Sequence, residues 1–375
     1  MIASPVLVTG GAGFIGSHLV EALLARGARV RVLDSLEPQV HGPGATRARH
    51  LPPGVELVHA SVCDAAAVDR ALAGVASVVH LAAQVGVGQS MYAIVPYVEE
   101  NVRGTAVLLD RVANGTRRIK RLVVASSMSI YGEGRYRCPA CGPVAPLPRP
   151  LAQLQAREWE LRCPTCRGVT TPAPCDEDKP IAPSCVYAVT KRDQEELCLC
   201  VGRAYGIGTV ALRLFNVYGP RQALSNPYTG VGAIFSSRLL NGQRPLVFED
   251  GRQSRDFIHV SDIVEAFCLA LEREDVSNVA LNVGTGRSTS VAALAEAIAR
   301  SMRVGIAPEI VGRFREGDIR HCVADVSRIE RRLGFRARMT LDKGVGDLVA
   351  WAAEQQADDH VPQARAELDR RGLIR

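Results

Sequence analysis

The chain has 375 residues, of which 47% are hydrophobic and only 5% aromatic. This length can hold one large α/β domain with a smaller lobe, built on a core of Ala, Val and Leu. The net charge of +6 comes from scattered arginines rather than from a basic block, which argues against a nucleic-acid partner and suits an anionic small ligand.

The N-terminal segment and the cysteines bear on cellular location. The sequence starts directly on a strand pattern without a signal peptide, and it has no apolar run long enough to cross a membrane. We therefore expect a cytoplasmic protein with no membrane partner. Its eleven cysteines are then expected to be thiols or metal ligands rather than disulfides.

The stretch around Gly10 has the pattern strand, glycine turn, helix. Val6–Val8 is a short apolar run suited to a buried parallel strand. In the G-x-x-G-x-x-G motif that follows, Gly10 permits a tight turn, Gly13 lets backbone amides approach a pyrophosphate, and Gly16 lets the helix pack closely on the sheet. The helix N-terminus adds unpaired N–H groups for phosphate. Ordinary turns also contain such glycine triplets, so the neighbouring segments decide whether this one is a dinucleotide-binding loop.

That context is a second strand, Arg29–Leu33, which ends in Asp34 about twenty residues after the glycines. A carboxylate at this place can accept hydrogen bonds from both hydroxyls of an adenosine ribose and would repel a 2′-phosphate. A solvated Asp at a strand end is the plainer alternative. The combination predicts a dinucleotide site that favours NAD over NADP.

Strands and helices alternate along the first part of the chain. Further strands are expected at 55–59, 77–81 and 122–126, with helices at 17–26 and from Glu100 onward. This alternation predicts an α/β fold, a Rossmann-type doubly wound parallel sheet that binds its ligand at the carboxyl ends of the strands.

Two short segments in this region are candidate cofactor contacts. The small residues of Leu81–Ala83 let a cofactor lie against the backbone. Asp64 either holds the adenine amino group or caps the helix Ala65–Leu72, and the sequence does not separate these alternatives.

A third group of residues has the pattern of a proton-transfer site. Ser127 follows Ser126 at the end of a strand, and Tyr187 and Lys191 lie four residues apart on a helix that continues to Ala204. A lysine beside the phenol, together with a positive nicotinamide, is expected to lower the pKa of the tyrosine toward neutrality and make it a general base for an alcohol. Ser127 would share the same hydroxyl. A Y-x-x-x-K pair alone is common by chance, and its value here comes from the two other motifs.

These motifs resemble the extended short-chain dehydrogenase/reductases, and specifically the branch of NAD-dependent nucleotide-sugar epimerases and dehydratases. The resemblance covers most of residues 1–350. Besides the motifs above, it rests on Asn101 and on the segments Leu212–Arg221, Ser254–Asp262, Leu281–Gly284 and Arg315–Asp318.

The resemblance implies a set of site residues. Ser127, Tyr187 and Lys191 would be catalytic, and Ser127, Asn216, Arg255 and Arg315 would bind the substrate, with the two arginines on its diphosphate. Surface ion pairs with Asp256 and Asp318 are the alternative for these arginines. The residues assigned to the cofactor are Gly10, Gly13, Phe14, Ile15, Gly16, Asp34, Ser35, Asp64, Ala65, Leu81, Ala82, Ala83, Asn101, Ser126, Tyr187, Lys191 and Phe215.

The positions after Ser127 bear on the reaction. By resemblance, 4,6-dehydratases and decarboxylases carry acidic residues there, whereas this chain has Met128 and Ser129. This favours a 4-epimerase that works through a 4-keto intermediate, and a 4,6-dehydratase is the alternative. As a whole the sequence looks most like dTDP-L-rhamnose 4-epimerases, which make dTDP-6-deoxy-L-talose, and UDP-glucose and UDP-glucuronate 4-epimerases are close competitors. A dinucleotide-sensing regulator on the same fold is the non-enzyme alternative.

A cysteine-rich insert departs from the family pattern. Cys138 and Cys141 form one C-P-x-C knuckle, and Cys163 and Cys166 form another. Two such knuckles predict a structural zinc site with four cysteine ligands; four reduced surface thiols are the alternative. Because the insert lies between Ser127 and Tyr187, we expect it to form a cap or edge over the sugar pocket.

The domain organisation follows from these assignments. Residues 1–132 and 179–221 would form the NAD-binding domain, 133–178 the insert, 222–350 mainly the nucleotide-sugar lobe and 351–375 a C-terminal tail. By resemblance, a homodimer is expected through the helices around 102–113 and 187–204.

Overall fold

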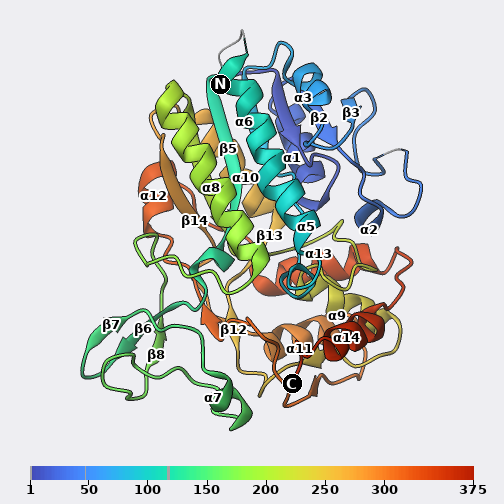
Figure 1. Cartoon of the computed structure of the whole chain (residues 1–375). Helices are drawn as coiled ribbons and strands as arrows, with labels where there is room; N and C mark the ends of the chain where they lie inside the picture. Colours follow the sequence, from blue (N-terminus) through green and yellow to red (C-terminus); the bar gives the residue numbers. More distant parts are fainter. Residues whose placement is uncertain (1, 47, 116–118) are drawn as a thin grey trace.

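The computed structural model describes residues 2–46, 48–115 and 119–375 (Figure 1). A seven-stranded sheet forms its centre, in the order β14-β9-β5-β4-β1-β2-β3, and every neighbouring pair is parallel. Its strands are β1 (Val6–Thr9), β2 (Val30–Asp34), β3 (Glu56–His59), β4 (Ser77–His80), β5 (Arg121–Ser127), β9 (Gly208–Leu214) and β14 (Val279–Val283). The strand order reverses direction between β1 and β4, so a ligand crevice is expected beyond their carboxyl ends. The predicted doubly wound α/β fold is confirmed.

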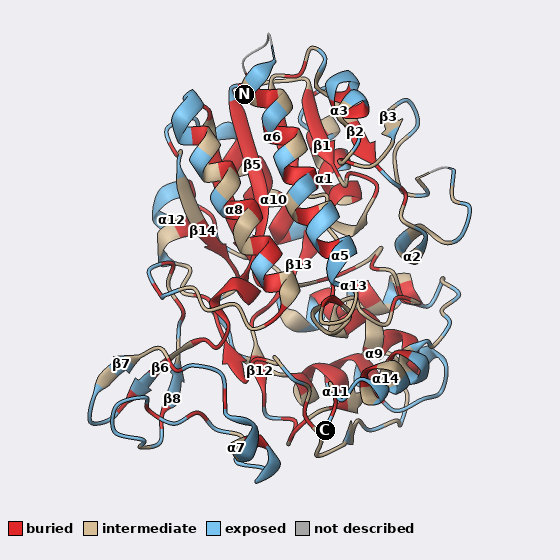
Figure 2. Ribbon diagram, viewed as in Figure 1, coloured by how far each residue is buried: buried red, intermediate tan, exposed pale blue. Residues whose placement is uncertain are grey.

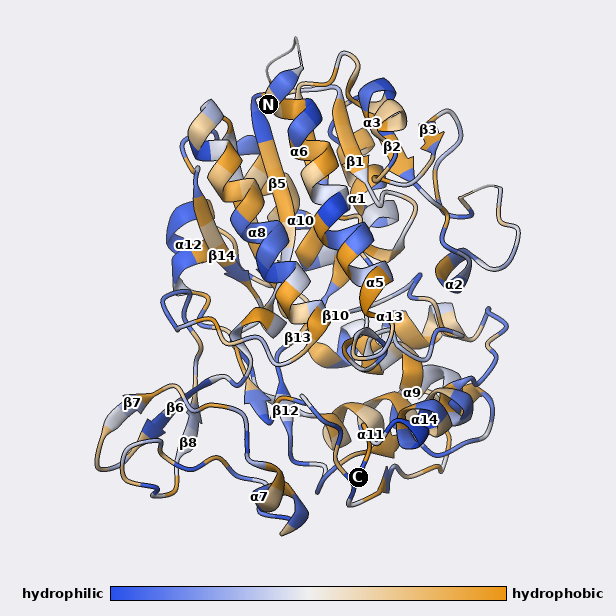
Figure 3. Cartoon of the chain, in the orientation of Figure 1, coloured by the Kyte–Doolittle hydropathy of each residue, from blue (hydrophilic) through white to orange (hydrophobic). Residues whose placement is uncertain are grey.

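Helices cover both faces of this sheet because successive strand residues point to opposite sides. Val6 and Val8 of β1 belong to the core beneath α1 (Phe14–Ala25) and α10 (Val260–Glu272). Leu7 belongs to the opposite core, beneath α3 (Ala65–Leu72), α6 (Gly104–Asn114) and α8 (Val186–Tyr205). Figure 2 shows the resulting buried sheet between half-exposed helices, and Figure 3 shows the hydrophobic strands.

A smaller lobe lies at the carboxyl ends of the strands. Its core is formed by α9 (Val231–Leu240), α11 (Val291–Ser301) and α13 (Leu341–Ala352). Short strand pairs surround them: β10 (Asn216–Tyr218) with β13 (Phe257–His259), β11 (Leu246–Val247) with β16 (Glu309–Ile310), and β12 (Ser254–Arg255) with β15 (Thr289–Ser290) and β17 (His321–Cys322). The predicted lobe 222–350 is interrupted, because α10, β14 and α12 (Ser327–Leu333) pack with the main sheet.

The insert leaves the main domain after the 3-10 helix η2 (Met128–Tyr131). It forms a small antiparallel sheet in the order β7-β6-β8 with one short helix, α7 (Leu151–Gln155). The strands are β6 (Arg135–Cys138), β7 (Gly142–Val144) and β8 (Thr171–Ala173). In Figure 1 the small sheet of this unit stands to the left of β12, beside the smaller lobe.

The segment predicted as a tail contains a helix, α14 (Val361–Arg370), that is fixed to the rest of the chain. Phe314 and Arg375 exchange two backbone hydrogen bonds of 2.9 and 3.0 Å. The Arg371 guanidinium lies 4.5 Å from the ring centre of Tyr92, which belongs to the main domain. The segment therefore ties the two lobes together.

Other short elements connect these units. They are α2 (Pro38–His41), α4 (Val87–Ser90), α5 (Ile94–Tyr97) and a π-helix, η1 (Val98–Arg103). Among the described residues, none of the helices combines the length and the apolar character needed to cross a membrane.

Candidate active site

A cavity of about 570 Å³ lies between the main sheet and the smaller lobe. Most of the predicted site residues line it together: the glycine loop, Asp34, the segment after β4, the Ser127 strand end, Tyr187, Lys191, Asn216 and both Arg255 and Arg315. Three predicted cofactor residues, Asp64, Ala65 and Asn101, lie outside its lining. Residues more than 300 positions apart in the sequence thus meet in one chamber.

The glycine loop presents backbone rather than side chains to the cavity. Gly10 has φ = 69°, and a Cβ there would lie 2.8 Å from the amide nitrogen of Ala82. Gly13 is the N-cap of α1 and provides no side-chain cap, so the first N–H groups of the helix stay available. These features fit a bound pyrophosphate.

Gly16 is required for a different reason from the one we predicted. A Cβ at this position would lie 2.2 Å from the carbonyl oxygen of Gly10 and 2.6 Å from the Cα of Gly11. The close approach is therefore between the helix and the loop that precedes it. A side chain at position 16 would displace this loop, so glycine is needed there to preserve the loop conformation.

Asp34 lies at the end of β2 and is buried. Its Oδ2 accepts a hydrogen bond from the Ala12 amide at 2.9 Å, and its Oδ1 accepts one from the Leu36 amide at 2.8 Å. Each oxygen keeps a further lone pair. The carboxylate can thus brace the glycine loop and still accept from a ribose, which fits the NAD preference expected from the sequence.

The three predicted residues outside the cavity lining have local contacts. Asp64 caps α3, because its Oδ1 accepts from the Ala67 amide at 3.1 Å. Of the two alternatives for Asp64, the structure shows the cap. Ala65 is the first residue of that helix. Asn101, on η1, bonds both backbone groups of Gln84 and the Thr190 hydroxyl, so it shapes the cavity wall at Gln84.

Ser127, Tyr187 and Lys191 meet where β5 ends and α8 begins. Burial raises the pKa of Tyr187 to about 12, and a hydrogen bond with Ser127 opposes this rise. Burial also lowers the pKa of Lys191 to about 8, and its Nζ donates to Gln194 Oε1 at 2.8 Å. The expected lowering of the tyrosine pKa is thus not found in the protein alone, because desolvation of the phenolate outweighs the other contributions.

The positions of Ser127, Tyr187 and Lys191 are held by further residues that were not predicted from the sequence. The Ser126 hydroxyl donates to Glu195 Oε2 at 2.5 Å, and Glu195 forms a two-pronged ion pair with Arg213. Gln194 donates from Nε2 to Thr105 Oγ1 at 2.9 Å. The spacing of positions 187, 191, 194 and 195 places them on one face of a helix. The sequence could therefore have indicated that residues 194 and 195 lie beside Tyr187 and Lys191.

The part of the cavity predicted to bind the substrate contains a buried polar atom without a partner among the described residues. This atom is Asn216 Oδ1, and such atoms in native proteins call for a ligand or water. Arg255 donates to the carbonyl oxygens of Ser254, Ile319 and Arg320. It does not pair with Asp256, whose carboxylate accepts from Thr285 and Gly286.

Arg315 is the arginine for which the ion-pair alternative holds. Its Nε lies 2.8 Å from Asp318 Oδ2, and its guanidinium lies 4.6 Å from the ring centre of Phe248. The pair is part-exposed, so it costs little to open when a ligand phosphate competes.

Helix α14 and the residues after it supply part of the cavity wall that the sequence analysis missed. Ala364, Leu368 and Ile374 line the cavity. In the sequence, Ala364 and Leu368 form an apolar pair four residues apart on an otherwise polar helix, and this pattern could have indicated a buried helix face. No residue of the insert 133–178 lines the cavity, so the expected cap is not found; the ends of the insert pair instead with the backbone after Arg320.

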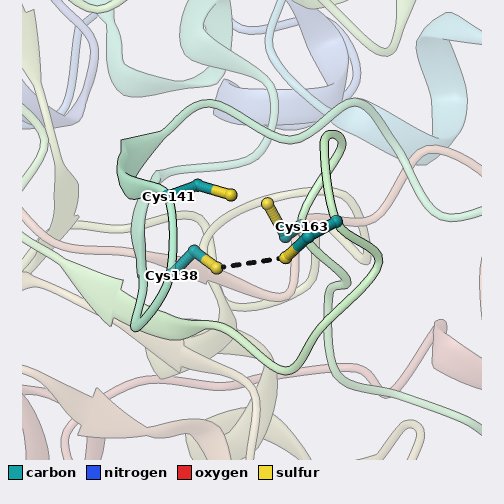
Figure 4. Close-up of side chains that lie close together, drawn as sticks. Cys138, Cys141 and Cys163 are labelled. Carbon is teal, nitrogen blue, oxygen red and sulfur yellow. Dashed lines mark hydrogen bonds between the residues drawn. The ribbon is translucent and has the colours of Figure 1, made fainter.

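The four cysteines of the insert converge, and all are free thiols. Their Sγ atoms all lie within 4.8 Å of one another, and Cys138 and Cys166 are 3.5 Å apart. In Figure 4, Cys138 and Cys141 lie on one turn and point toward Cys163. A tetrahedral zinc site with Zn–S bonds of about 2.3 Å needs sulfur separations of about 3.8 Å, so this cluster fits the ion.

Backbone amides of Cys166 and Thr165 lower the pKa of Cys163 to about 6. The thiolate is the form that binds metal.

Comparison with known proteins agrees with this geometry. The model of the NAD dependent epimerase/dehydratase family matches residues 6–148 and 166–284. A dTDP-L-rhamnose 4-epimerase from Burkholderia thailandensis is 37% identical, over 93% of this chain and 95% of that protein. A putative UDP-glucose 4-epimerase from Methanocaldococcus jannaschii is 32% identical, over 92% and 97%.

Solved structures show the same relationship. The Thermus thermophilus UDP-glucose 4-epimerase in complex with NAD is 31% identical and superposes with a TM-score of 0.73 over 94% of this chain and 99% of that one. The Thermotoga maritima UDP-glucose 4-epimerase with UDP-glucose gives a TM-score of 0.75 at 28% identity, over 93% and 98%. The chain therefore belongs to the NAD-dependent epimerase/dehydratase family.

Proposed function

We propose that this protein is an NAD-dependent nucleotide-sugar 4-epimerase. The observation that carries the proposal is the meeting of Ser127, Tyr187 and Lys191 with the glycine loop and Asp34 in one cavity. A general base for an alcohol and a cradle for a dinucleotide are the two parts that reversible oxidation of a sugar carbon requires.

Each catalytic residue has a role that its surroundings support. Tyr187 accepts the proton of the 4-hydroxyl, and Ser127 hydrogen-bonds the same oxygen. Lys191 adds positive charge on the same helix face, which favours the phenolate. NAD, held by the glycine loop and Asp34, would supply the hydride acceptor and a positive ring that offsets the burial of the phenolate.

The side chains after Ser127 favour epimerisation over dehydration. Met128 and Ser129 both line the cavity, and neither offers a carboxyl group for elimination. The Ser129 hydroxyl donates to Ser127 Oγ at 2.9 Å, which orients Ser127. A keto sugar at this site would then be reduced from either face rather than lose water.

For the substrate we propose dTDP-L-rhamnose, converted to dTDP-6-deoxy-L-talose. The support is the 37% identical relative of that activity, which is matched almost end to end. UDP-glucose is the second candidate, because a 32% identical relative and two solved neighbours carry that name. Asn216, Arg255 and Arg315 are proposed to hold the diphosphate.

We further propose a structural zinc ion on Cys138, Cys141, Cys163 and Cys166. The converging sulfurs support it, and four protein ligands leave no position for substrate. Metal analysis of the purified protein should give one zinc per chain, and Cys163→Ser should abolish it. A protein that is active and folded without metal would contradict this proposal.

A homodimer through α6 and α8 is also proposed. Its support is the group of apolar side chains exposed on α5, η1 and α8, which comprises Ile94, Val95, Val98 and Val189. Light scattering coupled to gel filtration should give twice the chain mass of 40.3 kDa, and a monomeric mass would exclude the dimer.

The activity is tested by incubation with a panel of dTDP-, UDP- and GDP-sugars, followed by NMR of the configuration at the 4-carbon. Inversion at that carbon without change of mass is expected. The variant Tyr187→Phe should lose about 10²- to 10⁴-fold in turnover and keep its NAD. Loss of one water from the product would instead identify a 4,6-dehydratase, and full activity of Tyr187→Phe would refute the mechanism.

A further inference from the structure

An ion network centred on the buried side chain of Arg320 joins the insert to the substrate lobe. The Arg320 side chain is 0% exposed and donates to one carboxylate of the insert and two of the lobe. Glu160 Oε1, from the insert, accepts from Arg320 Nε at 3.1 Å. Glu249 and Asp250, from the lobe, accept from Arg320 Nη1 at 2.9 and 2.6 Å. Glu160 is the contact through which the insert binds this side chain, and Arg320 keeps the carboxylates of Glu249 and Asp250 when Glu160 is removed.

The backbone beside this side chain is held by the insert as well. Glu133 Oε2, at the root of the insert, accepts from the Arg320 amide at 2.9 Å. The next residue, His321, is held twice: its carbonyl oxygen accepts from the Gly134 amide at 3.0 Å, and its Nε2 lies 3.2 Å from Glu160 Oε2. Hydrogen bonds from both the backbone and the side chains of the insert thus hold residues 320–321 in place.

The same segment orients Arg255 in the cavity. Arg255 Nη1 donates to the carbonyl oxygens of Ser254 at 2.9 Å and Arg320 at 3.1 Å, and its Nη2 donates to that of Ile319. β12 and β17 pair Arg255 with Cys322. Since an arginine has five N–H donors, these three bonds fix the guanidinium plane and leave two donors for a ligand.

Glu160 lies next to the second cysteine knuckle in the sequence. It lies three residues before Cys163, whose amide donates to the Gly168 carbonyl oxygen at 2.9 Å. The Thr170 hydroxyl closes the same turn by donating to the Leu161 carbonyl oxygen at 2.8 Å. The hydrogen bond from His321, followed by that from Arg320, lowers the pKa of Glu160 to about 2, so this carboxylate is charged at neutral pH.

We propose that the insert is a strut that positions Arg255 for the diphosphate of the substrate, with Glu160 and Arg320 as its positioning residues. This inference rests on the proposed function, and it gives the insert a role in nucleotide affinity although the insert does not touch the cavity. The family model leaves residues 149–165 unmatched, so the part that carries Glu160 is an addition to the family pattern.

The test compares Glu160→Gln with Glu158→Gln in the NAD-loaded full chain. Glu158 belongs to the same segment and is likewise exposed, but its ion pair among the described residues is a 3.5 Å contact with Arg162 rather than with Arg320. Titration calorimetry with UDP and with dTDP gives nucleotide affinity, and steady-state kinetics with the sugar that the wild type converts gives KM and kcat. NAD affinity and the melting temperature are measured alongside.

For Glu160→Gln we expect Kd for the nucleoside diphosphate and KM to rise about tenfold, with kcat and NAD affinity unchanged. Glu158→Gln should behave as the wild type, and Glu160→Asp should recover part of the affinity. Nucleotide binding equal to the wild type in Glu160→Gln would overturn the strut, as would a parallel loss of NAD affinity, which marks a general folding defect. If the wild type binds neither UDP nor dTDP, the proposed function fails first and the inference falls with it.

Discussion

The Ser126 hydroxyl donates to Glu195 Oε2 across 2.5 Å, and so ties the end of β5 to the second turn of α8 after Tyr187. Ser127 is the next residue on the strand, and Tyr187 lies two helical turns before Glu195. This hydrogen bond therefore fixes the register in which the hydroxyls of Ser127 and Tyr187 face one another. Glu195 is itself fixed by Arg213, at 2.6 Å from Nη2.

Glu195→Gln should destabilise the fold by about 3 kcal/mol, because it leaves the buried Arg213 without its charged partner. Urea denaturation followed by circular dichroism would measure this change. The exposed neighbour Glu196 pairs with Arg192 at 3.6 Å. It gives the matched control Glu196→Gln, which is expected within about 0.5 kcal/mol of the wild type. Equal stability of the two variants would contradict the role given to Glu195.

Gly16→Ala should weaken NAD binding by at least about tenfold, because the added Cβ would lie 2.2 Å from the Gly10 carbonyl oxygen and force the loop apart. Fluorescence titration with NADH measures the affinity. Gly346, inside α13 with nothing within 4 Å of a built Cβ, provides the control. Gly346→Ala should keep NAD affinity and stabilise its helix by up to about 1 kcal/mol. Normal NADH binding by Gly16→Ala would show that the loop tolerates displacement.

The buried pair Tyr187 and Lys191 predicts how stability depends on pH. The pKa of Lys191 is about 8 in the fold and about 10.4 in an unfolded chain. Between these values the unfolded state binds more protons, so the contribution of Lys191 to stability rises with pH. For Tyr187, about 12 against about 10, the folded state binds more protons, and its contribution falls as pH rises through that window.

Thermal melts from pH 7 to pH 11 of the wild type, Lys191→Met and Tyr187→Phe measure these contributions as differences. Relative to the wild type, the melting temperature of Lys191→Met should be raised most below pH 8, and this difference should disappear by about pH 10. A constant difference across the whole range would show that Lys191 keeps an ordinary pKa.

Truncation after His360 should remove nucleotide-sugar binding while the protein retains NAD. The removed segment supplies Ala364, Leu368 and Ile374 to the cavity wall, whereas the predicted NAD contacts of the glycine loop and Asp34 belong to the part of the chain that is kept. Calorimetry with UDP and dTDP, together with the NAD content of the purified protein, distinguishes the two sites. Arg370→Ala, at an exposed position on α14, is the control and should bind as the wild type. Unchanged nucleotide binding after truncation would show that the segment is not part of the site.

Local patterns made the dinucleotide half of the site predictable. Gly10 directly follows a strand, Asp34 and Ser127 each end one, and the parallel topology brings these strand ends to one edge. The Asp64 alternatives could not be resolved from sequence, because helix capping and adenine binding favour the same residue type at the same place.

The remaining features depend on contacts between distant segments. Glu195 has the sequence character of a solvated helix residue, yet it is buried against Ser126 and Arg213. The backbone pairing of Phe314 with Arg375 has no local signal. For Tyr187, the sequence indicated a neighbouring lysine but not the depth of burial, and burial decides the direction in which its pKa shifts.

The hydrogen bond from the Ala12 amide to Asp34 sets a limit on redesigning the coenzyme preference. Exchanging Asp34 for a small neutral side chain would admit a phosphorylated ribose, but it would also leave the amides of Ala12 and Leu36 without an acceptor. A variant that prefers the phosphorylated coenzyme therefore needs a second substitution that restores an acceptor beneath the loop.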